Sequence, residues 1–68
     1  MTNKALSAII KHLLQKTTLD SISHRLGISL QTLQRALNHQ PINWQYEKRI
    51  LMLYIDESAT LEINANHS

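Results

Sequence analysis

The residues of this chain best suited to chemistry are long polar side chains in the segment 29–38. Gln34 and Arg35 follow Gln31 by three and four residues, which places all three on one side of an α-helix. The Gln amide presents a donor beside an acceptor, and the Arg guanidinium presents a planar fork of donors. Such paired groups match the edges of nucleic-acid bases, since Gln can bind adenine and Arg can bind guanine through two hydrogen bonds. The chemistry expected here is base recognition rather than bond making.

Other kinds of chemical site lack the residues that they need. The chain has no cysteine, and its four histidines are scattered without an HxxxH pair, so no zinc site is expected. A single glycine excludes a glycine-rich phosphate loop, and no serine lies in a nucleophile-elbow context. No pair of carboxylates is placed for acid–base catalysis. We therefore expect no catalytic residue, no metal, no cofactor and no enzyme activity.

Charge is distributed unevenly along the 68 residues. Residues 1–50 contain all seven Lys and Arg side chains with two acidic residues, a net charge of +5. Residues 51–68 contain three acidic residues and no Lys or Arg, a net charge of −3. A basic body followed by an acidic tail favours binding to a polyanion, although a soluble surface with no partner can show the same imbalance.

The length allows one small domain. A chain of roughly 60 residues buries only about 60% of its unfolded surface, so helix packing, self-association or a ligand must support the core. No apolar run approaches the roughly 18 residues of a membrane span. The N-terminal stretch shows no signal-peptide pattern. These features predict a cytoplasmic protein that binds no membrane.

Apolar residues repeat at helical spacing in four segments, so we predict an all-α fold of four to five short helices. Hydroxyl side chains stand where the second and third helices begin, and Pro41 separates the third helix from the fourth. Apolar and polar residues alternate loosely over 59–63, which leaves a short strand and a frayed tail as alternatives. The predicted domain covers residues 1–58, with a tail or dimerisation arm over 59–68. The predicted helices cover residues 4–15, 19–26, 29–38 and 44–55.

The segment 18–37 meets the stereochemical requirements of a helix-turn-helix unit. Such a unit needs two short helices, a small residue where they cross, a residue without Cβ in the turn and a cap for the second helix. Ser23 is the small residue, Gly27 makes the turn and Ser29 supplies the cap. Apolar residues face inward from both helices and from the turn, namely Ile22, Leu26, Ile28, Leu33 and Leu37.

This segment resembles the helix-turn-helix of bacterial and phage regulators. With the helix before it and the helix after it, over residues 4–55, it resembles the lambda-repressor/Cro-like DNA-binding domain. The stretch 29–37 is also similar to the helix-turn-helix of AraC-type activators, which need two such units. This chain departs from the repressor pattern at His12, where Arg is common, and at Leu37, where an acidic residue is common. The ion pair that those two residues usually form is missing.

The resemblance implies that the segment 29–38 enters the major groove of double-stranded DNA. The residues then expected to contact base edges are Leu30, Gln31, Gln34 and Arg35. Short polar groups near helix ends are expected to hold phosphates, and these are Thr18, Ser29, Thr32, Asn38 and His39. A screened attraction to DNA that is independent of sequence would come from Lys11, Lys16, His24, Arg25 and His39. The alternative for each residue is an ordinary solvated surface or, for Thr18 and Ser29, helix capping alone.

Apolar residues after Pro41 predict self-association. One helix contacts only a few base pairs, and small DNA-binding modules usually gain affinity by dimerising on an inverted repeat. A strand at 59–63 would most naturally pair with its twin across a two-fold axis. The alternative is that the fourth helix only completes the core of a monomer. The candidate dimer interface consists of Trp44, Tyr54, Ile55, Leu61 and Ile63.

Three functions fit the sequence. The leading expectation is a sequence-specific transcriptional regulator, a small Cro-like repressor that binds double-stranded DNA as a homodimer and needs no small-molecule ligand. The alternative is a protein-interaction module, such as an antitoxin or adaptor, built on the same trihelical core. A nucleoid-type protein with little sequence preference is the third. Loss of DNA binding on changing Arg35 would favour the first, and loss of protein binding on changing Trp44 or Tyr54 the second.

Overall fold

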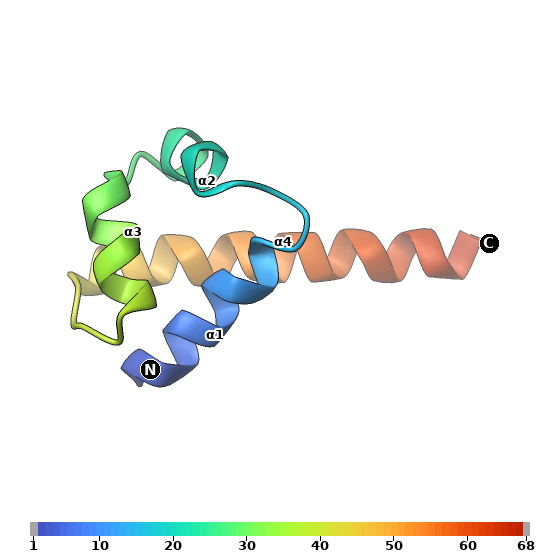
Figure 1. Ribbon diagram of the computed structural model, residues 1–68. Helices are drawn as coiled ribbons and strands as arrows, with labels where there is room; N and C mark the ends of the chain where they lie inside the picture. The colour runs from blue at the N-terminus through green and yellow to red at the C-terminus, as the bar shows by residue number, and fades with distance from the viewer. Residues whose placement is uncertain (1, 68) are drawn as a thin grey trace.

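The computed structural model describes the backbone of residues 2–67 and the side chains of residues 2–58. This part of the chain is all-helical and has no strand, which confirms the predicted fold class. The helices lie close to the predicted ranges, except that the first ends two residues earlier and the fourth continues much further. In chain order they are α1 (Asn3–Leu13), α2 (Leu19–Leu26), α3 (Leu30–Leu37) and α4 (Trp44–His67) (Figure 1).

Side-chain caps explain where α2, α3 and α4 begin. Thr18 Oγ1 accepts a hydrogen bond from the Ser21 N–H at 3.2 Å at the start of α2. Ser29 Oγ accepts one from the Thr32 N–H at 3.2 Å at the start of α3. Asn43 Oδ1 accepts one from the Gln45 N–H at 2.9 Å in the first turn of α4. These bonds satisfy N–H groups that have no partner inside a helix, so the caps stop each helix from extending backward.

The turn between α2 and α3 depends on a left-handed glycine. Gly27 has φ 67° and ψ 35°, and its N–H donates to the Ser23 carbonyl at 2.9 Å. The Ile28 N–H reaches the same carbonyl at 3.2 Å, and the Ser23 hydroxyl donates to the Ile28 carbonyl. Ile28 is buried beneath the turn. Two helices of eight residues are thereby joined by a short connection with a defined geometry.

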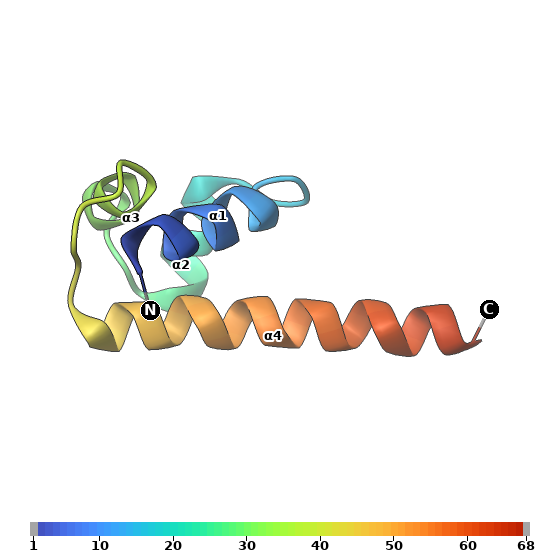
Figure 2. The ribbon, with the colours of Figure 1, turned by 90° about the horizontal axis from the view of Figure 1, so that it is seen from below.

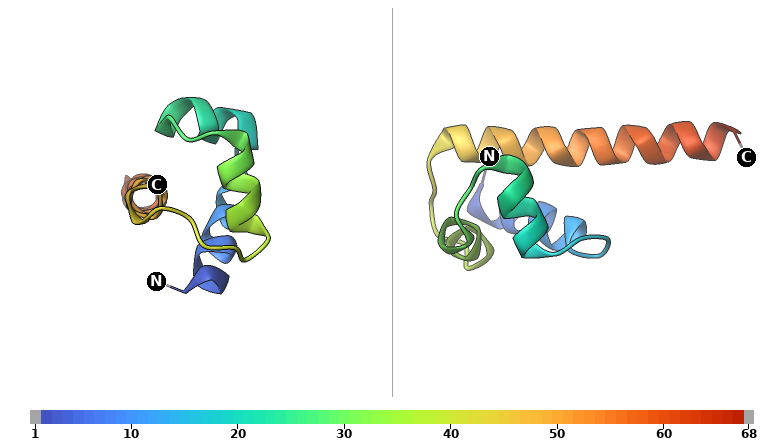
Figure 3. Two further views of the ribbon diagram at one scale, coloured as in Figure 1. Left: turned by 90° about the vertical axis from the view of Figure 1, so that its left-hand side faces the viewer. Right: turned by 90° about the horizontal axis from the view of Figure 1, so that it is seen from above.

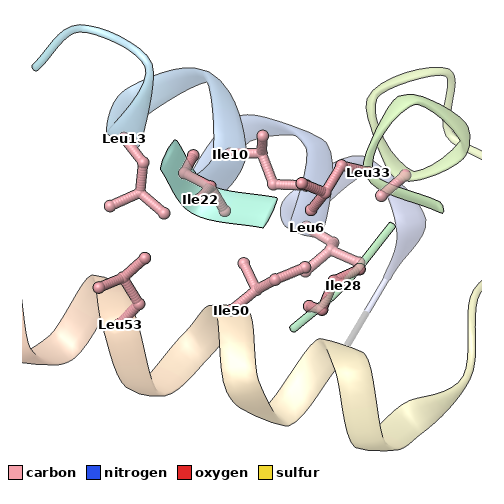
Figure 4. Packing of buried hydrophobic residues seen from close by; sticks show 9 residues of the cluster. Leu6, Ile10, Leu13, Ile22, Ile28, Leu33, Ile50 and Leu53 are labelled. Carbon is pink, nitrogen blue, oxygen red and sulfur yellow. The ribbon is translucent and has the colours of Figure 1, made fainter. Parts of the chain in front are cut away.

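Helix α1 is the centre of the packing. It contacts both α3 and α4, while α2 packs against α3 (Figure 3). Every helix and the α2–α3 turn contribute to one aliphatic core, shown in Figure 4. Because α1 and α2 pack against the inner side of α3, the outer side of α3 is held toward solvent. The core residues are Leu6, Ile10, Leu13, Ile22, Ile28, Leu33, Ala36, Ile50 and Leu53.

One polar side chain lies inside this core. Ser7 is buried, and its hydroxyl donates a hydrogen bond to the Leu37 carbonyl at 3.0 Å. That carbonyl belongs to the last residue of α3, where no further turn of helix can supply a donor. Ser7 therefore links α1 to the end of α3.

Helix α4 corrects the sequence-based prediction for the end of the chain. The backbone is helical through His67, so the expected end near Ile55 and the strand at 59–63 are both wrong. A lone strand in an all-helical chain would leave its backbone groups without partners. Continuing an existing helix adds one hydrogen bond per residue without a new nucleus. As a result, the last part of α4 extends beyond the other three helices (Figures 1 and 2).

Candidate nucleic-acid interface

Helix α3 has one face in the core and the opposite face in solvent. Leu33 and Ala36 are fully buried, whereas Gln31, Gln34 and Arg35 are exposed. Leu30, at the start of the helix, is also exposed. With eight residues the helix is about 12 Å long, and a major groove of about 12 Å width admits such a helix. The four residues predicted to contact bases thus lie together on the accessible side of one short helix.

Arg35 differs from the other arginines in having no partner among the described side chains. Its guanidinium makes no ion pair or hydrogen bond with any residue whose side chain the structure describes. Arg25 instead donates to Glu57 Oε1 of α4 at 3.3 Å. Arg49 donates to the Leu26 carbonyl at 3.3 Å. Among the described arginines, the one on the outer face of α3 therefore keeps all its donors available for a ligand.

The predicted phosphate-contact residues lie at both ends of α3, with one exception. Ser29 and Thr32 stand at its N-terminal end, where their hydroxyl oxygens are 2.8 Å apart. Asn38 and His39 are exposed at its C-terminal end, and His39 has a positive φ of 62° that turns the chain away. Thr18 caps the far end of α2, away from the turn that joins α2 to α3. Four of the five candidates therefore flank α3.

Arg49 is a positioning residue that the sequence did not reveal. It extends from α4 to the last carbonyl of α2, and its guanidinium carbon lies 5.6 Å from the centroid of the Tyr46 ring. A cation at the C-terminal end of a helix is favourable because that end carries partial negative charge. The contact joins residues 23 positions apart, so no local spacing indicates it. Arg49 ties the α2–α3 turn to α4.

The predicted dimer residues divide into three groups. The side chains of Trp44 and Ile55 are 65% and 50% exposed, and eleven residues of separation place them on the same face of α4. Met52, which the sequence did not single out, is exposed as well. Tyr54 is half-buried and contacts the His12 ring edge-on at 5.4 Å between centroids, so it packs within the monomer. The side chains of Leu61 and Ile63 lie outside the described part.

The described part of the chain lacks the features of a metal site and of a membrane span. No group of three or more His, Cys, Asp and Glu residues there could hold a metal ion. None of the described helices is long and apolar enough to cross a membrane. No protein-family model, curated protein or solved structure matches this chain.

Proposed function

We propose that this chain is a sequence-specific regulator that binds double-stranded DNA with α3 in the major groove. The observation that carries the proposal is the outer face of α3. Its polar residues are exposed and Arg35 is unpaired among the described residues, while the inner face is locked into the core. A helix held rigidly on one side with free planar donors on the other can present those donors at fixed spacing to base edges.

In this proposal each residue of the outer face has a distinct contact. Arg35 binds guanine O6 and N7, and Gln31 and Gln34 bind adenine N6 and N7. Leu30 packs against a thymine methyl group. Each bidentate pair discriminates by about 1–3 kcal/mol against a wrong base. Polar groups at the two ends of α3 contact the phosphates that border the groove, which sets the position of the helix.

The proposed regulator acts as a cytoplasmic homodimer of the Cro-like kind and represses by occluding a promoter. Because the C-terminal segment is helical and provides no strand for pairing, the proposed dimer contact is the outer face of α4. Trp44 and Ile55 both lie on that face, and each is at least half exposed. A two-fold axis through α4 would present two copies of α3 to an inverted repeat.

The test is a binding selection from a random duplex library at about 0.15 M salt. We expect the protein to enrich an inverted repeat and Arg35→Ala to lose one specified base in each half-site. Lys4→Ala is the matched control, because it removes the same charge from an exposed position at the start of α1, outside both the α3 face and the outer face of α4. It should select the same sequence as the unmodified chain. A library that comes through unenriched would contradict the proposal.

A nucleoid-type role predicts a different result. Its binding would weaken steeply with salt, since phosphate contacts release counterions, but it would select no sequence. Gln31→Ala and Arg35→Ala would then leave the affinity for any duplex nearly unchanged. Affinities measured for one duplex across a salt series, in the unmodified chain and in both variants, separate the two roles.

A protein-interaction module is the second candidate function, and the exposed apolar face of α4 favours it. Trp44, Met52 and Ile55 form a row that is too accessible to serve the monomer core. Exposed aromatic residues of this kind are enriched at protein interfaces. Trp44→Ala would abolish such an interaction and leave DNA selection intact. Loss of selection in Trp44→Ala together with loss of dimer would instead assign this face to the homodimer.

A further inference from the structure

A cavity of about 370 Å³ lies between α1, the α1–α2 loop, α2 and α4. Its floor is apolar and consists of Leu13, Ile22 and Leu53, all members of the core. Figure 4 shows Leu13 and Leu53 facing one another from α1 and α4, with Ile22 beside them. The volume is within the range of small-ligand pockets, roughly 300–1,000 Å³. None of the lining residues belongs to α3, so the cavity is separate from the proposed DNA-binding face.

The rim of the cavity is cationic. The charged residues that line it are Lys16, Arg25 and Glu57, which together carry a net charge of +1. The Lys16 ammonium has no ion pair or hydrogen bond with any described side chain. Arg25 gives Glu57 a single hydrogen bond, and its side chain is 64% exposed. A guanidinium has five N–H donors, so most of those on Arg25 remain free.

We propose that this cavity binds a small amphipathic carboxylate. The apolar floor takes the hydrocarbon body, which is favourable because burial removes apolar surface from water. Lys16 and Arg25 take the single negative charge, and the Arg fork matches the geometry of a carboxylate. A neutral apolar compound would leave the cationic rim unused, and a cation would be repelled by it. A monoanion matches both the shape and the net charge of +1.

Glu57 does not block this ligand. An exposed ion pair contributes little to stability, so Arg25 can turn from Glu57 to an incoming carboxylate or bind both at once. Thr17, Ser21 and Ser58 also line the cavity and offer hydroxyl groups to the same charge. The headgroup therefore contacts several donors at the rim, while the hydrocarbon body packs on Leu13, Ile22 and Leu53.

The experiment is an NMR titration of the full chain with three probes: octanoate, 1-octanol and inorganic phosphate. Octanoate should shift the methyl signals of Leu13, Ile22 and Leu53 and saturate. 1-Octanol should bind about 25-fold more weakly, because it loses the charge contacts with both Lys16 and Arg25, each worth about fivefold. Phosphate should leave these methyl signals in place. Lys16→Gln should weaken octanoate about fivefold without affecting 1-octanol, while Lys4→Gln, at the other end of α1, should change neither.

Four results would overturn the proposal. Shifts of the same methyl signals on raising the protein concentration alone would identify a second copy of the chain as the occupant instead of a carboxylate. An octanoate titration that never saturates would exclude a site. If Lys16→Gln and Lys4→Gln weakened octanoate binding equally, the loss would come from the net charge of the protein and not from a contact with Lys16. If phosphate shifted the methyl signals as octanoate does, binding would not require a hydrocarbon body on the apolar floor. None of these results bears on whether α3 binds DNA.

Discussion

Replacing Gly27 by Ala tests how α2 is joined to α3. The residue has φ 67° and ψ 35°, a left-handed conformation in which an L side chain costs about 1–2 kcal/mol. Steric contact adds little, because a Cβ at this position would meet only the Arg49 guanidinium at 4.0 Å, an ordinary van der Waals distance. The loss expected from Gly27→Ala is therefore conformational and about 1–2 kcal/mol. For a domain of this size, each kcal/mol lowers the melting temperature by about 4–8 °C.

The assay is thermal and urea unfolding followed by far-UV circular dichroism. Gly27→Asn is the matched control, because asparagine enters the left-handed region more readily than alanine while adding more volume. We expect Gly27→Asn to lose less stability than Gly27→Ala. If the contact with Arg49 governed the site instead, the larger asparagine side chain would be the more damaging.

Two results would refute this reasoning. A melting temperature of Gly27→Ala equal to or above that of the unmodified chain would mean that the turn does not require positive φ. A loss beyond about 3 kcal/mol would exceed the conformational cost and would require a clash at this open position.

Three further predictions concern the supports of α3 and the core. Ser7→Ala should cost about 1–2 kcal/mol in urea unfolding, because the Leu37 carbonyl loses its donor inside the core; no measurable loss would mean that another donor replaces the hydroxyl. Ser29→Ala should cost about 1 kcal/mol and speed amide hydrogen exchange at Thr32, whose N–H it caps; unchanged exchange would argue against the cap. Ile50→Ala should cost about 2–5 kcal/mol, enough to lose most helical circular dichroism in so small a domain, and a cooperative transition near the original melting temperature would contradict this.

Much of the candidate site was predictable because it depends on local chemistry. The single glycine stands after a short apolar-periodic segment, and a hydroxyl residue follows two positions later. Capping and left-handed turns act within a few residues, so these types and spacings determine where α2 ends and α3 begins. The period of the apolar residues then determines which face of α3 is buried. Gln31, Gln34 and Arg35 emerge on the other face for the same reason.

Features that join distant segments were not predictable in this way. Arg49 contacts the end of α2 from α4, and Ser7 contacts the end of α3 from α1. From the local sequence alone, Arg49 resembles an ordinary surface residue and Ser7 an ordinary helix residue. Likewise, Tyr54 packs within the monomer because α1 brings His12 against its ring and because the hydrophobic core lies beside it.

The sequence by itself determined the all-helical fold class, the caps and turn of α2 and α3, and the polar face of α3, because each follows from interactions within one or two helical turns. The tertiary structure decided the helical course of α4 through residues 59–63, since a strand there has no partner to satisfy its backbone. It also decided where Arg25 and Lys16 stand. Packing of α1, α2 and α4 places these cations at the rim of an apolar cavity, a juxtaposition that no spacing along the chain encodes.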